Sequence, residues 1–104
     1  DAEILMVPAA FTRTTGEAHW LPLLQARAIE NQCYVVAAGL YGEQGKRQTW
    51  GHSVIIDPWG KIQTCLPKGQ GLISTSVDPE RLAQIRRQMP VAQHARFSAD
   101  WRSE

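Results

Sequence analysis

Two short apolar segments with a helical pattern between them constrain the fold of this chain more than any other feature. Residues 2–8 are apolar after one early charge and end at Pro8, and residues 33–38 form a second apolar segment. Segments of this kind predict strands buried on both faces of a sheet. Between them, apolar residues recur at helical spacing from Ala18 to Asn31, which predicts an amphipathic helix. The order strand, helix, strand is typical of the α/β class.

The start of this helix is predicted from its polar flank. Residues 9–16 are rich in small residues and threonine and are expected to form a loop. Thr14 stands three residues before Glu17, which is the spacing of a capping box. Pro22 has no backbone N–H and is tolerated only in the first turn, so the helix is expected to begin near Ala18.

Further strands and one more helix are expected in the second part of the chain. Residues 40–52 are glycine-rich and polar and are expected to form a long loop. Strands are expected at 53–57 and 61–65 around a Pro-Trp-Gly turn, and again at 71–77. The last helix is expected to start at Pro79 and to end at Pro90, with Asp78 as its N-cap. Its apolar stripe is expected to consist of Leu82, Ile85 and Met89.

These elements are not expected to make a complete domain. Two helices cover too little of a sheet that is buried on both faces, and the chain opens inside a predicted strand. We therefore expect the chain to be the back half of a larger α/β enzyme domain.

The bulk composition excludes several classes of partner. The formal net charge of +1 gives no reason to expect a nucleic acid, and no apolar run approaches the roughly 20 residues that span a bilayer. The two cysteines, Cys33 and Cys65, fit neither a disulfide framework nor a metal-ligand spacing. A reducing, cytoplasmic setting is therefore expected.

Five ordered segments resemble those of a known family. They are Ala2 to Phe11, Thr15-Gly16-Glu17-Ala18-His19-Trp20, Gln25 to Ala38, Gly51-His52-Ser53 and Asp57-Pro58-Trp59-Gly60. The match continues through Leu82, Ile85-Arg86-Arg87 and Pro90-Val91. Together these segments resemble the nitrilase, or carbon–nitrogen hydrolase, superfamily. The resemblance ends near Phe97, so residues 1–97 are expected to be a partial carbon–nitrogen hydrolase domain and residues 98–104 a tail.

The resemblance implies a four-layer α-β-β-α sandwich, of which this chain would form the C-terminal half, and a homo-oligomer built through helices. It also implies a Glu-Lys-Cys triad, in which the thiolate attacks an amide carbonyl, the Glu moves protons and the Lys stabilises the oxyanion. All three residues lie upstream in the family, so no catalytic residue is expected here. The implied substrate is a small amide that carries a carboxylate, and no metal or organic cofactor is implied.

Phe11 and Thr15 are the expected substrate-binding residues. In the family the corresponding loop lines the pocket, with the Phe as an apolar wall and the Thr hydroxyl on the substrate. The position of the loop agrees, because it follows the C-terminal end of a strand and leads into a helix N-terminus. The alternative is that Thr14 and Thr15 only cap the helix and that Phe11 belongs to the core.

Glu30, Cys33 and Lys46 repeat the residue types of the triad but are not expected to form one. The family's nucleophile is followed by a polar turn that exposes its sulfur, whereas Cys33 leads into an apolar strand. Burial raises the pKa of a thiol and makes it unreactive, so Cys33 and Cys65 are interpreted as structural. Lys46 and Arg47 either border the mouth of the pocket or face solvent.

Two other groups of polar residues have structural interpretations. His19, beside Trp20, is interpreted as a packed, hydrogen-bonded side chain. Arg27 and Glu30 are expected to pair and, buried beside Asn31, to fix the helix against the sheet.

His52 and Ser53 suggest a hydrolase pair, but neighbours in a strand point to opposite faces, which argues against a dyad. Trp50 and Trp59 are interpreted as packing or dimer-contact residues. A second hypothesis for the whole chain is an assembly module that binds an N-terminal half, or docks onto a homologous subunit through its exposed sheet edge and helices.

Overall fold

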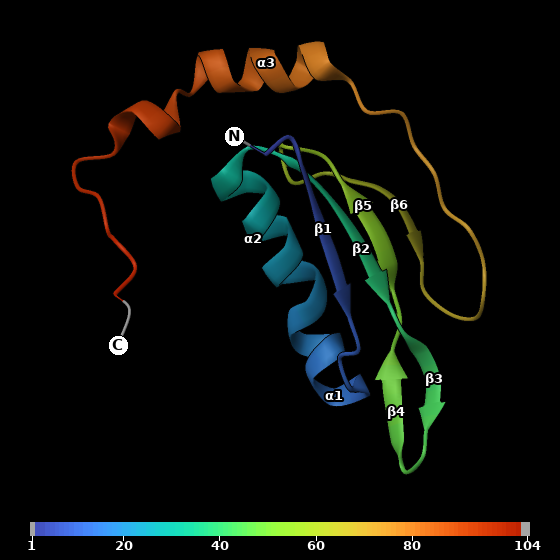
Figure 1. The fold of residues 1–104 in the computed structure, drawn as a ribbon. Coiled ribbons are helices and arrows are strands. Elements are labelled where there is room, and N and C mark those ends of the chain that lie inside the picture. The colour runs from blue at the N-terminus through green and yellow to red at the C-terminus, as the bar shows by residue number, and fades with distance from the viewer. Residues whose placement is uncertain (1, 103–104) are drawn as a thin grey trace.

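The computed structural model describes residues 2–102 (Figure 1). The first half contains β1 (Ile4–Ala9), α1 (Arg13–Thr15), the π-helical segment η1 (Gly16–Trp20), α2 (Leu21–Asn31) and β2 (Tyr34–Gly39). The second half contains β3 (Tyr41–Gln44), β4 (Arg47–Trp50), β5 (Ser53–Ile56), β6 (Ile62–Leu66), α3 (Pro79–Gln88) and the 3-10 segment η2 (Val91–His94).

One mixed sheet forms the centre of the fold. Its strand order is β1-β2-β5-β6, with β1 and β2 parallel and the other pairs antiparallel. The helical stretch from α1 to α2 connects the two parallel strands, as a parallel pair requires. The strand-helix-strand order and the hairpin of β5 and β6 were predicted, and the structure confirms both.

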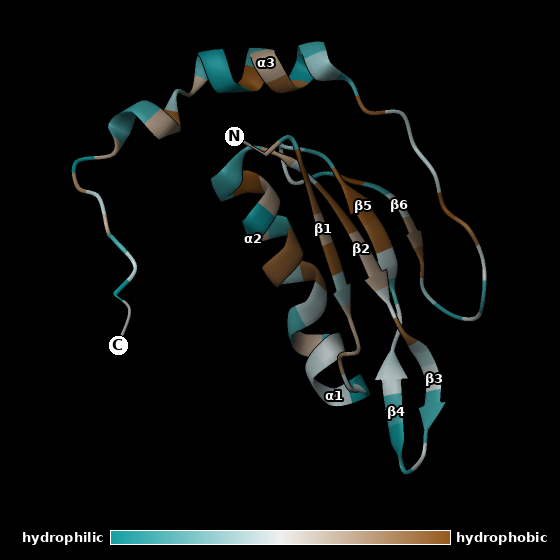
Figure 2. Ribbon diagram, in the orientation of Figure 1, coloured by the Kyte–Doolittle hydropathy of each residue, from teal (hydrophilic) through white to brown (hydrophobic). Residues whose placement is uncertain are grey.

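The core lies between α2 and one face of the sheet. Its buried members are Trp20, Leu24, Ala28, Val35, Ala37, Val54 and Ile56. In Figure 2 much of the ribbon of the central strands and part of α2 have the colour of hydrophobic residues. The prediction that β1 is buried on both faces is wrong. β1 is an edge strand with a helix on one side only, so Leu5 and Val7 are half-buried, whereas Met6 on the other face is 70% exposed.

The helix begins earlier than predicted, at Arg13 rather than Ala18. Thr12 occupies the N-cap and makes no side-chain cap bond, so the predicted capping box of Thr14 and Glu17 is not formed. Pro22 consequently follows nine helical residues. The π-helical segment η1 ends at Trp20, two residues before Pro22, and a wider turn at this place suits both the missing N–H donor and the proline ring.

Two predictions about the later segments are also wrong. Residues 40–52 are not a loop, because β3 and β4 form a two-stranded antiparallel hairpin that extends beyond the end of the main sheet (Figure 1). Residues 71–77 do not pair as a strand and form an extended connection to α3. Both errors concern exposed backbone, where side-chain pattern carries little information.

Helix α3 starts as predicted. The Asp78 carboxylate accepts hydrogen bonds from the backbone N–H groups of Glu80 and Arg81, and Pro79 follows the cap. Leu82 and Ile85 are buried, whereas Met89 is 42% exposed at the C-cap. Beyond η2 the chain is extended and exposed, and residues 103–104 of the predicted tail lie outside the described residues.

Candidate functional site

Phe11 lies in the short connection between β1 and α1. Its ring is half-buried, and its centroid lies 4.9 Å from that of Trp20 with a tilt of 55° between the planes. The buried indole therefore fixes the position of Phe11. Part of the ring is packed against the core, and the rest remains available as an apolar wall.

Thr15 lies one helical turn later and is exposed. Its hydroxyl donates to the backbone oxygen of Thr12 at 3.3 Å and lies 3.1 Å from the Thr12 hydroxyl. It does not cap the helix, because the N-cap position belongs to Thr12. The Thr15 side chain is therefore held by a local contact at the surface, four residues after Phe11.

The hairpin of β3 and β4 is tied to this loop. The backbone N–H of Trp50 donates to the carbonyl of Phe11 at 2.8 Å, and Thr12 forms a β-bridge with Thr49. Gly16 permits this close approach, because a Cβ there would lie 2.2 Å from the Cβ of Trp50. Loop and hairpin therefore form one structural unit at this end of the sheet.

A hollow of about 540 Å³ lies between the loop and the hairpin. We call it the hairpin hollow, and it is lined by Thr12, Arg13, Thr14, Glu43, Gly45, Lys46, Arg47 and Gln48. Lys46 and Arg47 thus border a concave surface next to the predicted substrate loop. Arg13 was not predicted from the sequence as a residue of the candidate site. The signal available was its position between two threonines, close after Phe11.

The bend before β5 presents a stacked pair of aromatic rings. The Trp50 indole and the His52 imidazole lie 4.1 Å apart with an interplanar angle of 5°. Nδ1 of His52 lies 3.1 Å from the Trp50 carbonyl, which can only accept, so this bond places the ring proton on Nδ1. The stack was not predicted from the sequence. Two residues separated by one glycine can stack only where the backbone bends between them, and the side-chain pattern does not indicate such a bend.

His52 and Ser53 do not form a dyad, as predicted. The Ser53 hydroxyl accepts from the backbone N–H of Gly39 at 3.0 Å and lies 3.4 Å from the Gly39 carbonyl. The hydroxyl is therefore bound to the end of β2, while the imidazole bonds to Trp50.

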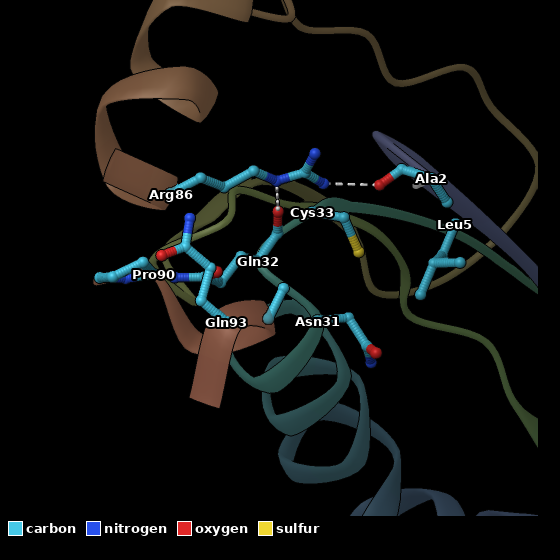
Figure 3. A pocket seen from close by; sticks show the side chains of 9 residues that line it. Ala2, Leu5, Asn31, Gln32, Cys33, Arg86, Pro90 and Gln93 are labelled. Atoms are coloured by element: carbon cyan, nitrogen blue, oxygen red, sulfur yellow. Dashed lines mark hydrogen bonds between the residues drawn. The ribbon is translucent and has the colours of Figure 1, made fainter. Parts of the chain in front are cut away.

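Cys33 is buried, as predicted. It is 1% exposed, and burial raises the pKa of its thiol, although the nearby Arg86 guanidinium opposes that effect. Arg86 donates to the carbonyls of Gln32 at 3.0 Å and Ala2 at 2.6 Å, beside a hollow near the thiol (Figure 3). Burial also raises the pKa of the Cys65 thiol, and a raised pKa disfavours the thiolate form that a nucleophile needs.

The residue types that imitate the triad do not meet. Glu30 and Cys33 lie near the C-terminal end of α2, whereas Lys46 lies in the turn of the distal hairpin (Figure 1). Glu30 pairs with Arg27, as predicted, but both side chains are 52% exposed, so this pair does not fix the helix against the sheet. His19 is also exposed rather than packed, because it lies on the outer side of η1.

In the part of the chain that the structure describes, no cluster of three or more His, Cys, Asp or Glu side chains has the arrangement of a metal site. No helix among residues 2–102 has both the length and the apolar character needed to cross a membrane.

Comparisons with known proteins agree on one family. The carbon–nitrogen hydrolase family pattern matches residues 1–87. The deaminated glutathione amidase of Yersinia enterocolitica is 53% identical over 97 residues, which cover 92% of this chain and 34% of that protein. The deaminated glutathione amidase of Homo sapiens is 51% identical over 96 residues, which cover 91% of this chain and 29% of that protein.

A solved structure matches in the same way. The crystal structure of the C. elegans NitFhit protein has a TM-score of 0.82 and 43% identity, covering 91% of this chain and 23% of its own. The chain spans about a third of the length of the curated relatives named above, and its α/β fold corresponds to part of their domain. The family pattern and these identities show that the chain belongs to the carbon–nitrogen hydrolase family.

Proposed function

We propose that residues 1–97 are the C-terminal part of an amidase that hydrolyses small carboxylate-bearing amides, deaminated glutathione among them, with residues 98–104 as a tail. The observation that carries this proposal is the 53% identity to the Yersinia deaminated glutathione amidase over 97 residues. Deaminated glutathione is a 2-oxo acid joined through an amide to cysteinylglycine. Its hydrolysis consumes one water and yields 2-oxoglutarate and the dipeptide.

The proposed chemistry is covalent catalysis. A Cys thiolate attacks the amide carbonyl, a Glu delivers a proton to the departing amine, and a Lys stabilises the tetrahedral oxyanion. Water, deprotonated by the same Glu, then hydrolyses the thioester. The raised pKa values of Cys33 and Cys65 support an upstream origin for the nucleophile.

Phe11 and Thr15 are proposed to contact the substrate. The half-buried ring, fixed by Trp20, would provide an apolar wall, and the surface hydroxyl would provide one hydrogen bond. A cytoplasmic setting and a homo-oligomer are part of the same proposal. Free thiols at Cys33 and Cys65 support the first, since such thiols persist in reducing compartments.

The test compares the chain alone with the chain supplied with its upstream part. The 104 residues are incubated with deaminated glutathione, and release of 2-oxoglutarate and cysteinylglycine is measured. The same assay follows co-expression with the part of the Yersinia relative that precedes its matched region. Activity is expected only in the second case. Turnover by the chain alone would refute the proposal that the nucleophile lies upstream. No turnover in either experiment would count against the proposed amidase function.

An assembly module is the second candidate, favoured by the open face of the sheet. An apolar hollow lies on the side away from α2, and Met6 and Leu72 on it are 70% and 93% exposed. An unpartnered surface of this kind favours docking of the upstream part of a family domain. Size-exclusion chromatography with urea unfolding tests it. Without a partner we expect aggregation or a molten state, and a compact monomer that unfolds cooperatively would remove the reason for this role.

A further inference from the structure

The hairpin hollow carries an excess of positive charge. Arg13, Lys46 and Arg47 line it, against a single acid, Glu43. Within residues 2–102, none of these three cations forms an ion pair with a carboxylate. Three cations around a concave surface raise the local concentration of anions.

A neutral side chain orients one of these cations, and a tight backbone turn places the other two next to each other. A terminal guanidinium nitrogen of Arg13 donates to Oε1 of Gln48 at 3.3 Å, which orients the group without neutralising it. Lys46 and Gly45 form the two-residue turn of the hairpin, with Gly45 at a φ of 64°, and Arg47 begins β4. The tight turn therefore brings both basic residues to one tip.

The hollow is fixed relative to the proposed substrate loop. The Trp50 to Phe11 hydrogen bond and the Thr12 to Thr49 bridge join the hairpin to the loop that carries Phe11 and Thr15. Thr12 belongs to both surfaces, because it lines the hollow and contacts the Thr15 hydroxyl. If the acyl half of a substrate is held at the loop, its amine half would extend along the hairpin.

We propose that Arg13, Lys46 and Arg47 form a specificity subsite that binds the carboxylate of the amine half of the substrate. The substrate class is an amide whose leaving group is an amino acid or a short peptide with a free carboxylate; this inference rests on the proposed amidase function. Hydrolysis leaves that carboxylate unchanged, so the subsite holds the same half before and after the C–N bond breaks. Guanidinium groups suit this ligand, because they bind carboxylates through paired hydrogen bonds.

A binding experiment on the chain co-expressed with the upstream part tests the subsite without requiring activity. Amide chemical shifts are followed during titration with S-methylcysteinylglycine and, separately, with its C-terminal carboxamide. The free carboxylate is expected to bind about fivefold tighter, the effect of a few exposed charge pairs. K46Q/R47Q should abolish this difference. K61Q/R87Q is the matched control, because it removes the same charge from exposed residues outside the hollow and should retain it.

A kinetic experiment with the enzyme that includes the upstream part separates the two proposals. Hydrolysis of deaminated glutathione releases a dipeptide that carries a carboxylate, whereas hydrolysis of 2-oxoglutaramate releases only ammonia. The ratio of kcat/KM for the first substrate to that for the second should fall about fivefold in K46Q/R47Q and stay constant in K61Q/R87Q. If neither substrate is hydrolysed, the amidase proposal fails while the binding experiment still decides the subsite. Equal binding of carboxylate and carboxamide, or an unchanged ratio in K46Q/R47Q, would overturn the subsite.

Discussion

The indole Nε1 of Trp20 donates a 2.8 Å hydrogen bond to the backbone carbonyl of His52. Trp20 is 2% exposed at the end of η1, and His52 lies in the bend before β5 with a φ of 56°. This bond joins the helical stretch to a backbone conformation that non-glycine residues rarely adopt. The same indole also supports Phe11, so one buried side chain organises both flanks of the candidate site.

Trp20→Phe is therefore expected to destabilise the fold. The substitution leaves the His52 carbonyl without its donor and opens a cavity in the core, which together cost about 2 kcal/mol. Urea unfolding followed by circular dichroism measures the effect, here and for the variants below on the chain co-expressed with its upstream part. Trp59→Phe serves as the control, because that side chain is 57% exposed. Equal unfolding midpoints for the two variants would contradict the assigned role.

Asp57 connects the turn between β5 and β6 to the rest of the molecule. One carboxylate oxygen accepts from the backbone N–H groups of Trp59 and Lys61, each at 2.9 Å, and the other from Gln63 and Arg81. Asp57→Ala leaves these donors unpaired at a site that is 3% exposed and is expected to cost about 3 kcal/mol.

Arg81→Ala is the matched control for Asp57→Ala. Its contact with Asp57 is long, at 3.4 Å, and the Arg81 side chain is 45% exposed, so the loss should be about 0.5 kcal/mol. Thermal unfolding of both variants tests the ranking, and a larger loss for Arg81→Ala would show that the ion pair outweighs the turn bonds.

The cysteines predict an alkaline limit to stability. Burial raises the pKa of Cys33 and Cys65 above the ordinary value of 9.0, so the unfolded state loses these protons first as pH rises. The contribution of these thiols to the free energy of unfolding is complete below their ordinary pKa. It is lost as the pH rises toward the higher pKa that they have in the folded state. The free energy of unfolding should therefore decrease above pH 9 less steeply in Cys33→Ala/Cys65→Ala than in the natural sequence. Parallel pH profiles would exclude this linkage.

Thr15→Val should impair hydrolysis without affecting stability. The hydroxyl is exposed, so its loss leaves the core unchanged, while loss of one substrate hydrogen bond should reduce kcat/KM about tenfold in the enzyme that includes the upstream part. Thr75→Val is the matched control, because this threonine is also exposed and lies outside both the substrate loop and the hairpin hollow. If both variants lose activity equally, the loss does not come from substrate contact at Thr15.

The sequence predicted the elements that have strong local signals. The apolar segment of β2, the Pro-Trp-Gly turn and the Asp78-Pro79 cap each specify a structure without help from distant residues. The hairpin of β3 and β4 carries no such signal, because most of its residues are polar and exposed and its strands pair through their backbones. The start of the helix was misplaced because the chain uses Thr12 without a side-chain cap.

The candidate site was predicted only in part for a similar reason. Phe11 and Thr15 belong to a contiguous segment, so a single motif identified them together. Arg13, Lys46 and Arg47 converge only after the hairpin folds back onto the loop, and their separation in sequence hides this arrangement. Contacts between distant segments that are made through backbone hydrogen bonds produce no periodic pattern of apolar side chains in the sequence.

The turn at Gly45 and Lys46 lies beyond the end of the main sheet and contributes no residue to the core. Its length and its basic residues can therefore change during evolution while the packing around Trp20 is retained. Homologous hydrolases could in this way acquire different leaving-group preferences through small insertions at the hairpin tip, without redesigning the parts that let the protein fold.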